Sequence, residues 1–343
     1  MSLTVSSLES HGDPEFNGEP DSAGEAVSKD VEGRSPTKLA MARFRKDKLS
    51  MAALIVTVLF LITAIASPIL VTLGVLDPQS LNQEKVDLIS GGLPYGFGGG
   101  ISWSHPLGVE PRTGRDVLSR LMLGTTLSLT IAMVGAIITV VIGTVLGIIA
   151  GFTGGVVDSV VGRIIDLTLS FPQTLMLLAL SGVLVDAMQD IGVPRGPDAS
   201  FVNGLYIVLV LSAFGWPPVA RLIRGQVLSI REREYIDAAI MMGASRPRIY
   251  FKEILPNLWA PLLVYFTLLM PAYVSAEAAL SFLGVGIKTP TPTLGNVLNG
   301  ALGYAYTDLV FFFVPAIVIA AIVISFNLLG DGARDALDPK SGR

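Results

Sequence analysis

The sequence contains no cysteine and only two histidines, His11 and His105, which lie far apart in the chain. Without cysteine the protein has no disulfide bond, thiolate metal site or cysteine nucleophile. Two distant histidines supply little for a metal site or a catalytic pair, and we expect His105 to stabilise a loop. The chain also lacks a Gly-x-x-x-x-Gly-Lys-Ser/Thr phosphate loop, so it is not predicted to hydrolyse ATP. We therefore expect no catalytic, metal-binding or cofactor-binding residues.

Charge is scarce as well. Charged residues make up 15% of the 343 residues, whereas hydrophobic residues make up 51%. Soluble domains carry about 25% charged residues. No charge occurs between Lys48 and Asp77, a gap long enough to cross about 30 Å of hydrocarbon as a helix. The composition predicts an integral membrane protein.

Six uncharged blocks predict six transmembrane helices and an all-α integral membrane fold. The predicted helices lie near residues 50–72, 125–150, 164–185, 203–220, 258–280 and 309–330. Pro172 stands in the first turns of the third block and is expected to kink it. In the second block Gly143, Gly147 and Gly151 recur every four residues, which predicts close packing against another helix on that face.

The charges that remain are segregated along the chain. An acidic tail over 1–37 is predicted to be disordered, because residues 1–33 hold eight acidic residues, one lysine and no apolar pattern. The basic segment that follows predicts a cytoplasmic N-terminus, and six spans return the C-terminus to the same side. The predicted parts are a basic segment with helix 1 over 38–76, an extracytoplasmic loop over 77–120, a core of five helices over 121–332 and a cytoplasmic tail over 333–343. The core contains a cytoplasmic loop over 221–256.

The positive-inside rule is satisfied by the loop 221–256, which holds seven basic residues. It conflicts with the loop 77–120, which would be external although it contains Lys85, Arg112, Arg115 and Arg120.

The loop 221–256 has a helical pattern of its own. Tyr235 to Met242 favours a helix, which Gly243 can end in a left-handed conformation. Ser245 and Pro247 are suited to the start of a second helix. The small Ala238 and Ala239 would let a partner approach closely. From spacing alone, a solvated loop with a helical bias explains the pattern equally well.

The segment from Glu234 to Pro256 resembles the EAA loop of permeases in ATP-driven importers, with Asp237 where that family most often has Glu. Further resemblances are carried by His105–Gly108 with Gly114–Arg120, by Ser275–Gly284 and by Asn327–Pro339. Together they resemble the C-type permease subunit of the dipeptide/oligopeptide/nickel ABC importers, which has the type I importer permease (MetI-like) fold. The match begins near residue 38.

The resemblance implies a pore subunit, not an enzyme, in the bacterial cytoplasmic membrane. Its implied partners are a homologous second permease, two ATP-binding subunits that carry ATP and Mg²⁺, and an extracytoplasmic peptide-binding protein; nucleic acid is not among them. The residues implied in coupling to the ATPase are Glu234, Asp237, Ala238, Ala239, Gly243, Leu255 and Pro256.

Several alternatives stay open. A nickel or other small-solute importer of the same family differs little in sequence from a peptide importer. An intramembrane hydrolase would need paired Asp, or Ser with His, inside the spans, and a stand-alone channel would leave the EAA-like segment without a role.

Individual charged and aromatic residues allow two interpretations each. Glu277 is either a pore-lining or gating carboxylate or, as we favour, an interfacial residue whose charge meets water. Arg163 and Asp166 have the spacing of a helical ion pair. Asp158 is expected in a solvated loop, and Trp216 is expected to anchor a helix at the lipid interface.

Overall fold

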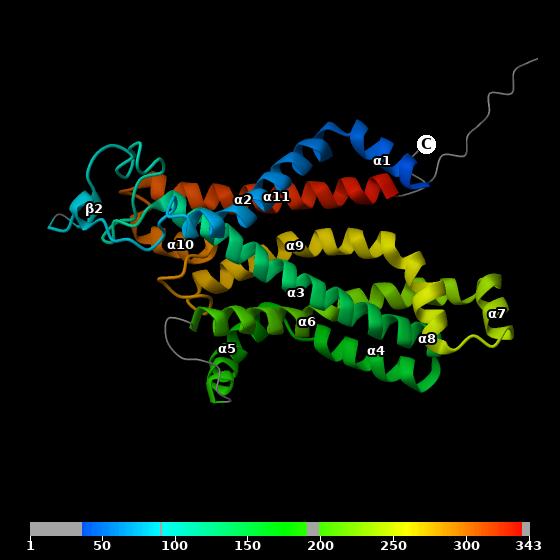
Figure 1. Ribbon diagram of the computed structural model, residues 1–343. Coiled ribbons are helices and arrows are strands. Elements are labelled where there is room, and N and C mark those ends of the chain that lie inside the picture. The colour runs from blue at the N-terminus through cyan, green and yellow to red at the C-terminus, as the bar shows by residue number, and fades with distance from the viewer. Residues whose placement is uncertain (1–35, 90, 191–198, 338–343) are drawn as a thin grey trace, which may run out of the picture.

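The computed structural model describes residues 36–89, 91–190 and 199–337, so the acidic tail predicted over 1–37 lies almost wholly outside the described residues. Long helices run side by side (Figure 1). At one end lies a small lobe that includes residues 83–94, and at the other a short helical elbow that includes residues 234–248. The helices and strands are α1 (Pro36–Lys46), α2 (Lys48–Thr72), η1 (Gln83–Lys85), β1 (Val86–Asp87), β2 (Leu93–Pro94), α3 (Val117–Thr153), α4 (Gly155–Leu169), α5 (Gln173–Asp190), α6 (Ala199–Arg231), α7 (Glu234–Met241), α8 (Arg246–Arg248), η2 (Ile249–Ile254), η3 (Leu255–Leu258), α9 (Trp259–Phe282), α10 (Leu294–Ala301), η4 (Leu302–Tyr304) and α11 (Leu309–Leu337). β1 and β2 pair antiparallel.

Within the described residues, five helical stretches are long and apolar enough to cross a membrane, and a bent pair of helices makes a sixth. The bent pair is α4 with the first part of α5, and the two meet at 77°. The predicted kinked helix over 164–185 is therefore wrong in detail, because the helix stops before Pro172. Proline lacks the N–H that a helix needs and disfavours helical backbone in the residue before it.

Three other bounds differ from the prediction. The segment 151–163, between the second and third predicted helices, is mostly helix α4, whose Val156, Val157 and Val160 are exposed apolar residues on the surface of the bundle. α6 continues beyond the predicted end at 220 to Arg231, and α11 continues beyond 330 to Leu337. These charged extensions lie past the apolar stretches, where a helix can continue in water; a hydropathy pattern marks only the part in lipid.

The packing of α3 on α6 is the closest in the bundle and uses the predicted glycine stripe. A Cβ atom added at Gly143 would lie 2.5 Å from Cβ of Val219, and one at Gly147 would lie 2.8 Å from the carbonyl oxygen of Ala220. A Cβ at Gly151 would likewise meet α6, 2.9 Å from Cβ of Val227. The prediction of close packing on this face is confirmed.

α4 is fixed to α6 by two ion pairs near the elbow end. Asp158 accepts hydrogen bonds from Nε and Nη2 of Arg224, the second of them 2.7 Å long. Asp166 accepts a hydrogen bond of 2.7 Å from Nη2 of Arg221. Asp158 is thus a helical residue with a partner and not a solvated loop residue. Asp166 pairs across the helix interface instead of with the predicted Arg163, because α6 brings two guanidinium groups against this face.

Trp216 also differs from its predicted role. Its side chain is buried beside Ile165 and Ala220 between α4 and α6, away from a lipid interface. The sequence could not show this, because the positions of apolar residues do not tell which faces of two helices pack on one another.

The lobe explains why basic residues occur in the loop 77–120. Arg120 is fully buried, with Nε 3.5 Å from Oε2 of Glu110 and Nη1 donating to the carbonyl oxygen of Pro290 at 3.1 Å. Arg115 lies 4.0 Å from the same carboxylate. Arginines buried in ion pairs hold a loop together and are poor indicators of membrane side, so they weaken the conflict with the positive-inside rule.

A second polar contact joins the lobe to α3. Nδ1 of His105 lies 2.8 Å from Oδ1 of Asp116, whose Oδ2 accepts a hydrogen bond of 2.7 Å from the backbone N–H of Ser119. Asp116 is the N-cap of α3. His105 therefore has the structural role predicted for it. Nearby, the hydrogen bond from the Ser80 hydroxyl, helped by backbone N–H groups, keeps the pKa of Asp77 below its usual value.

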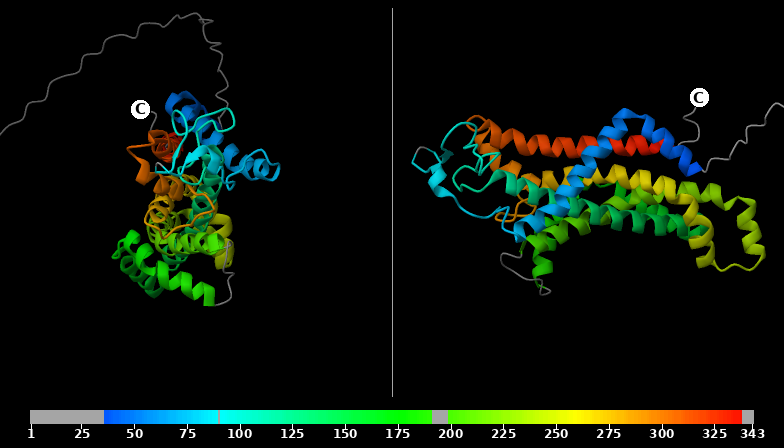
Figure 2. Two further views of the ribbon diagram at one scale, coloured as in Figure 1. Left: turned by 90° about the vertical axis from the view of Figure 1, so that its left-hand side faces the viewer. Right: turned by 45° about the horizontal axis from the view of Figure 1, so that its top comes forward.

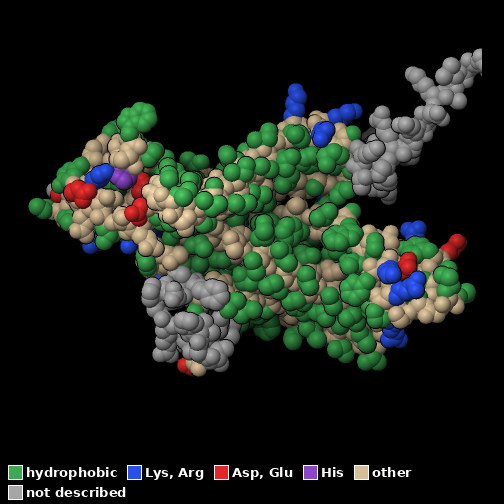
Figure 3. Space-filling model, viewed as in Figure 1, with side chains coloured by type: hydrophobic (Ala, Val, Ile, Leu, Met, Phe, Trp, Pro, Cys, Tyr) green, Lys and Arg blue, Asp and Glu red, His purple; other side chains and the backbone are tan. Residues whose placement is uncertain are grey.

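The surface divides into three zones along the helices. Hydrophobic side chains cover the middle of the face shown in Figure 3, while charged side chains gather on the lobe at one end and on α1 and the elbow at the other. The right-hand view of Figure 2 likewise places the lobe and the elbow at opposite ends. This distribution is the one expected of helices that cross a bilayer.

We predict that Gly147→Leu destabilises the bundle by about 1–3 kcal/mol, because the new side chain must push α3 away from α6. The measurement is thermal unfolding of the purified protein in lipid nanodiscs. Gly225→Leu is the matched control, since nothing lies within 4 Å of a Cβ at that position of α6. Equal melting temperatures for the two variants would contradict the close packing.

Candidate functional site: an elbow and an apolar groove

The elbow is built from α7, a tight turn and a second helical limb. α7 covers Glu234–Met241, one residue from the predicted Tyr235–Met242 at each end, and Gly243 lies just beyond it with a φ of 78°. That left-handed conformation strains any residue with a Cβ, which accounts for glycine at this position. The second limb begins with Ser245 as the residue before α8, although its side chain makes no capping hydrogen bond. The predicted helix-turn-helix is confirmed.

The second limb runs into the transmembrane helix without a break. From Arg246 to Phe282 the chain is helical throughout, but η2 is a π-helix and η3 a 3₁₀-helix. Pro256 lies in η3, where its missing N–H removes a helical hydrogen bond and the ladder changes register. Changes of helix type of this kind commonly mark hinges.

The residues singled out in the sequence divide between two faces of the elbow. Most are exposed at the end of the molecule: Glu234, Asp237, Ala238, Gly243 and Pro256. Ala239 is buried and Leu255 is half-buried against the bundle. The small size of Ala239 therefore serves packing inside this chain, and only Ala238 is placed to meet a partner.

Large apolar side chains surround these exposed residues. Tyr235, Ile240, Met241, Met242 and Phe251 are exposed, with Met241 88% and Met242 81% accessible. We call these five residues the elbow patch. A cluster of large apolar groups at a charged, water-facing end marks a protein-binding surface, and methionine side chains adapt readily to a partner.

One buried residue links the elbow to the transmembrane helices. Ile236 of α7 is fully buried in a cluster with Ile148 of α3 and Ile223 of α6. Tyr250 on the second limb packs edge-on against Phe152 of α3, with ring centroids 5.3 Å apart. These close-packed contacts fix α7 and the second limb against α3 and α6.

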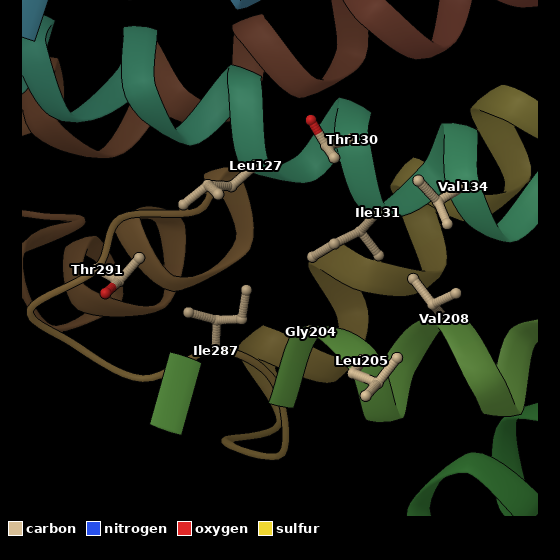
Figure 4. Close-up of a pocket in the computed structure, with 9 residues that line it drawn as sticks. All are labelled: Leu127, Thr130, Ile131, Val134, Gly204, Leu205, Val208, Ile287 and Thr291. Atoms are coloured by element: carbon tan, nitrogen blue, oxygen red, sulfur yellow. The ribbon is translucent and has the colours of Figure 1, made fainter. Parts of the chain in front are cut away.

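An apolar groove of about 370 Å³ opens between α3, α6 and the segment before α10 (Figure 4). Ile131 of α3, Val208 of α6 and Ile287 of the connecting segment point toward the space between these elements. The groove is lined by Leu127, Thr130, Ile131, Val134, Gly204, Leu205, Val208, Ile287 and Thr291. No lining residue is charged, so the groove suits side chains or uncharged parts of a molecule and not a bare ion.

Glu277 of α9 is fully buried and does not line the groove. Its Oε2 accepts a hydrogen bond of 2.6 Å from the hydroxyl of Ser128 on α3, and its Oε1 accepts one of 2.7 Å from Ser281. The Ser128 hydroxyl in turn accepts a hydrogen bond of 3.2 Å from the backbone N–H of Leu294, the first residue of α10. The predicted interfacial carboxylate in contact with water is wrong. Sequence could not show this, because the hydroxyl partners come from α3 and from the same face of α9.

Glu277 thus joins three elements. The hydroxyl of Thr293 donates to Ser281 at 3.4 Å, and Thr293 with Asn296 forms a capping box at the start of α10. The network holds α10, and with it the segment that carries Ile287 and Thr291, against α3 and α9. A carboxylate in such a place is satisfied only while these partners stay together.

Comparisons with known proteins agree with this architecture. The profile of the family described as "Binding-protein-dependent transport system inner membrane component" matches residues 143–343, and that of the N-terminal TM domain of oligopeptide transport permease C matches residues 35–86. The oligopeptide transport system permease protein OppC of Bacillus subtilis (strain 168) is 34% identical, over 93% of this chain and 94% of that protein.

A second curated protein shows the same similarity. The dipeptide transport system permease protein DppC of Haemophilus influenzae is 33% identical, over 85% of this chain and 92% of that protein. A chain of the inward-facing MetNI methionine ABC transporter aligns with a TM-score of 0.49 and 21% identity, over 64% of this chain and 97% of that chain. The expected fold class, an all-α integral membrane permease, is confirmed by the family match. The chain belongs to the family of binding-protein-dependent transport system inner membrane components.

Proposed function

We propose that this chain forms half of the pore of an ATP-driven importer of di- or oligopeptides and that the elbow couples the pore to a separate ATPase. The observation that carries the proposal is the elbow itself: an exposed apolar patch joined through buried Ile236 to the helices that line the groove. The oligopeptide and dipeptide permeases among its relatives support the choice of substrate.

The coupling follows from the two faces of the elbow. The elbow patch and Asp237 sit in a recess of an ATP-binding subunit, which holds ATP and Mg²⁺, while this chain binds neither. When two such subunits close on ATP, α7 moves with them. Ile236 passes the movement to α3 and α6, and the irregular helix around Pro256 lets the second limb bend.

The groove forms one wall of the translocation path, and a homologous second permease supplies the other. Its lining of aliphatic and threonine side chains accommodates varied peptide side chains without a fixed charge partner. Nickel uptake by the same family is the alternative, but nickel prefers imidazole, carboxylate or thiolate ligands. None of the nine lining residues carries one, which favours peptides.

The elbow end faces the cytoplasm and the lobe faces outward, where a peptide-binding protein delivers substrate. Basic side chains on α1 and around α8 support this orientation, because positively charged segments flanking spans stay in the cytoplasm. Both described ends of the chain, α1 and the end of α11, then lie on the cytoplasmic side (Figure 1).

Glu277 acts in this scheme as part of the outer gate. It is placed away from the groove surface, so it does not bind substrate; it positions α10 and the groove wall. Opening the pore to the outside requires this wall to shift, and the hydroxyl–carboxylate network sets how firmly it is held.

We expect the ATPase rate of the complex, reconstituted in lipid with its partners and its binding protein, to rise when a peptide mixture is added. The stimulated rate should be on the order of 1–100 turnovers per second, within the range of ordinary enzymes, and nickel should have no effect. Stimulation by nickel alone would assign the chain to metal uptake, and no co-purifying ATPase would contradict the importer.

We expect Asp237→Arg and Gly243→Pro to lower peptide uptake about tenfold or more while leaving the subunit inserted in the membrane. The first reverses a charge beside the elbow patch, and the second cannot adopt the left-handed turn. Uptake into proteoliposomes is compared with ATPase rate to detect uncoupling. Lys46→Glu, an exposed charge reversal on α1 at the same end, is the control; normal uptake by both elbow variants would refute the coupling role.

We expect Glu277→Ala to destabilise the subunit by about 1–3 kcal/mol, because it leaves the hydroxyls of Ser128 and Ser281 without their acceptor. Glu277→Gln keeps one acceptor oxygen and should be milder. Thermal unfolding measures the first effect, and passive peptide leak into liposomes measures the gate. A Gln variant as damaging as the Ala variant in both measurements would show that the network is not what holds α10.

A further inference from the structure

A second pocket lies on the lobe, where the segment after β2 meets the start of α11. It has a volume of about 390 Å³ and is lined by Leu93, Pro94, Gly96, Phe97, Gly98, Gly99, Tyr306, Thr307, Asp308, Leu309 and Val310. It shares no lining residue with the apolar groove. In Figure 1 these segments lie at the end of the molecule opposite the elbow. The pocket is therefore separate from the proposed substrate path.

Asp308 is the charged group of this pocket, and half of its carboxylate is unsatisfied. The side chain is only 5% exposed. Oδ1 accepts a hydrogen bond of 3.1 Å from the backbone N–H of Phe311 and so caps α11. Oδ2 is buried and has no hydrogen-bond partner among the described residues. A buried carboxylate oxygen without a donor is costly, so its energy falls when a cationic donor arrives.

Aromatic and glycine residues shape the rest of the pocket. Tyr306 is 99% exposed and Phe97 is 93% exposed, so two rings lie open to water beside the carboxylate. Gly99 lies directly over the carboxylate: a Cβ atom there would be 2.7 Å from Oδ2. A carboxylate flanked by aromatic rings attracts an ammonium or guanidinium group through charge and through the ring faces.

We propose that this pocket receives a lysine or arginine side chain of the extracytoplasmic solute-binding protein when that protein docks on the lobe. The inference rests on the proposed function only for the existence of that partner. A protein is favoured over a free peptide because the pocket shares no lining residue with the groove and carries exposed aromatic rings, which are enriched in protein interfaces.

The incoming cation must displace Gly99 slightly to reach Oδ2, since that oxygen is covered in the unliganded protein. Gly98 and Gly99 have φ values of 63° and 77°. Because glycine has no Cβ atom, the backbone at these two positions can change conformation more easily than at other residues. Docking would therefore be sensed at Asp308, the first turn of α11.

The test is the affinity of the purified binding protein, loaded with a peptide mixture, for the reconstituted importer carrying Asp308→Asn. Asparagine keeps the oxygen that caps α11 and caps helices as well as aspartate, so the fold is retained while the charge is lost. We expect the Kd to rise about tenfold, and more at low than at high salt. Glu84→Gln, an exposed carboxylate on the same lobe, is the matched control and should leave the Kd unchanged.

A charge swap gives a second readout. Asp308→Lys should abolish docking, and replacing one basic residue of the binding protein by aspartate should restore it. An Asp308→Asn variant that docks like the wild type would overturn the pocket's role. A wild-type importer that binds no peptide-binding protein would overturn the proposed function instead, so the two failures are distinguishable.

Discussion

The close contact of α3 with α6 is the constraint on which the rest of the molecule depends. Gly143, Gly147 and Gly151 leave no room for a side chain, so the two helices touch backbone to side chain over several turns. In lipid there is little hydrophobic gain from bringing helices together, and such close packing supplies the attraction. Because the crossing is tight at the elbow end, the same pair can separate toward the lobe, where the apolar groove opens between them.

The elbow is attached to the bundle through this pair of helices, α3 and α6. Ile236 enters the cluster that α3 and α6 form just beyond the glycine contacts, and Arg231 of α6 donates to the carbonyl oxygen of Gly151 at 3.4 Å. A force on α7 therefore acts on both helices as one body. The flexible part is the second limb, whose π- and 3₁₀-helical turns around Pro256 lack regular hydrogen bonding. Because the Ile236 cluster is rigid and the second limb is flexible, the elbow can tilt without unfolding.

Sequence reasoning identified the spans, the glycine stripe and the elbow, because each depends on local spacing: uncharged length, a four-residue repeat, and a helix followed by glycine. It missed features that depend on residues distant in the chain. Glu277 was expected in water, yet its partner Ser128 lies on another helix. Asp158 was misplaced because the first part of α4 was expected to be a loop, and Trp216 because its partner Ile165 lies on another helix. Asp308 gave no signal, because nothing in its neighbourhood shows that the segment after β2 covers it.

Buried polar groups are concentrated toward the lobe end, and their placement suits a wall that must move. Arg120 forms an ion pair with Glu110 and donates a hydrogen bond to the carbonyl oxygen of Pro290. Glu277 is linked through Ser128 to the first residue of α10. Apolar packing alone would permit many nearly equal positions of this wall, whereas a buried polar group tolerates only arrangements that give it hydrogen-bond partners. Such a wall has few allowed positions and moves between them as a unit. That behaviour fits the outer gate proposed above, and it gives a reason for polar groups in a place where apolar side chains would be easier to bury.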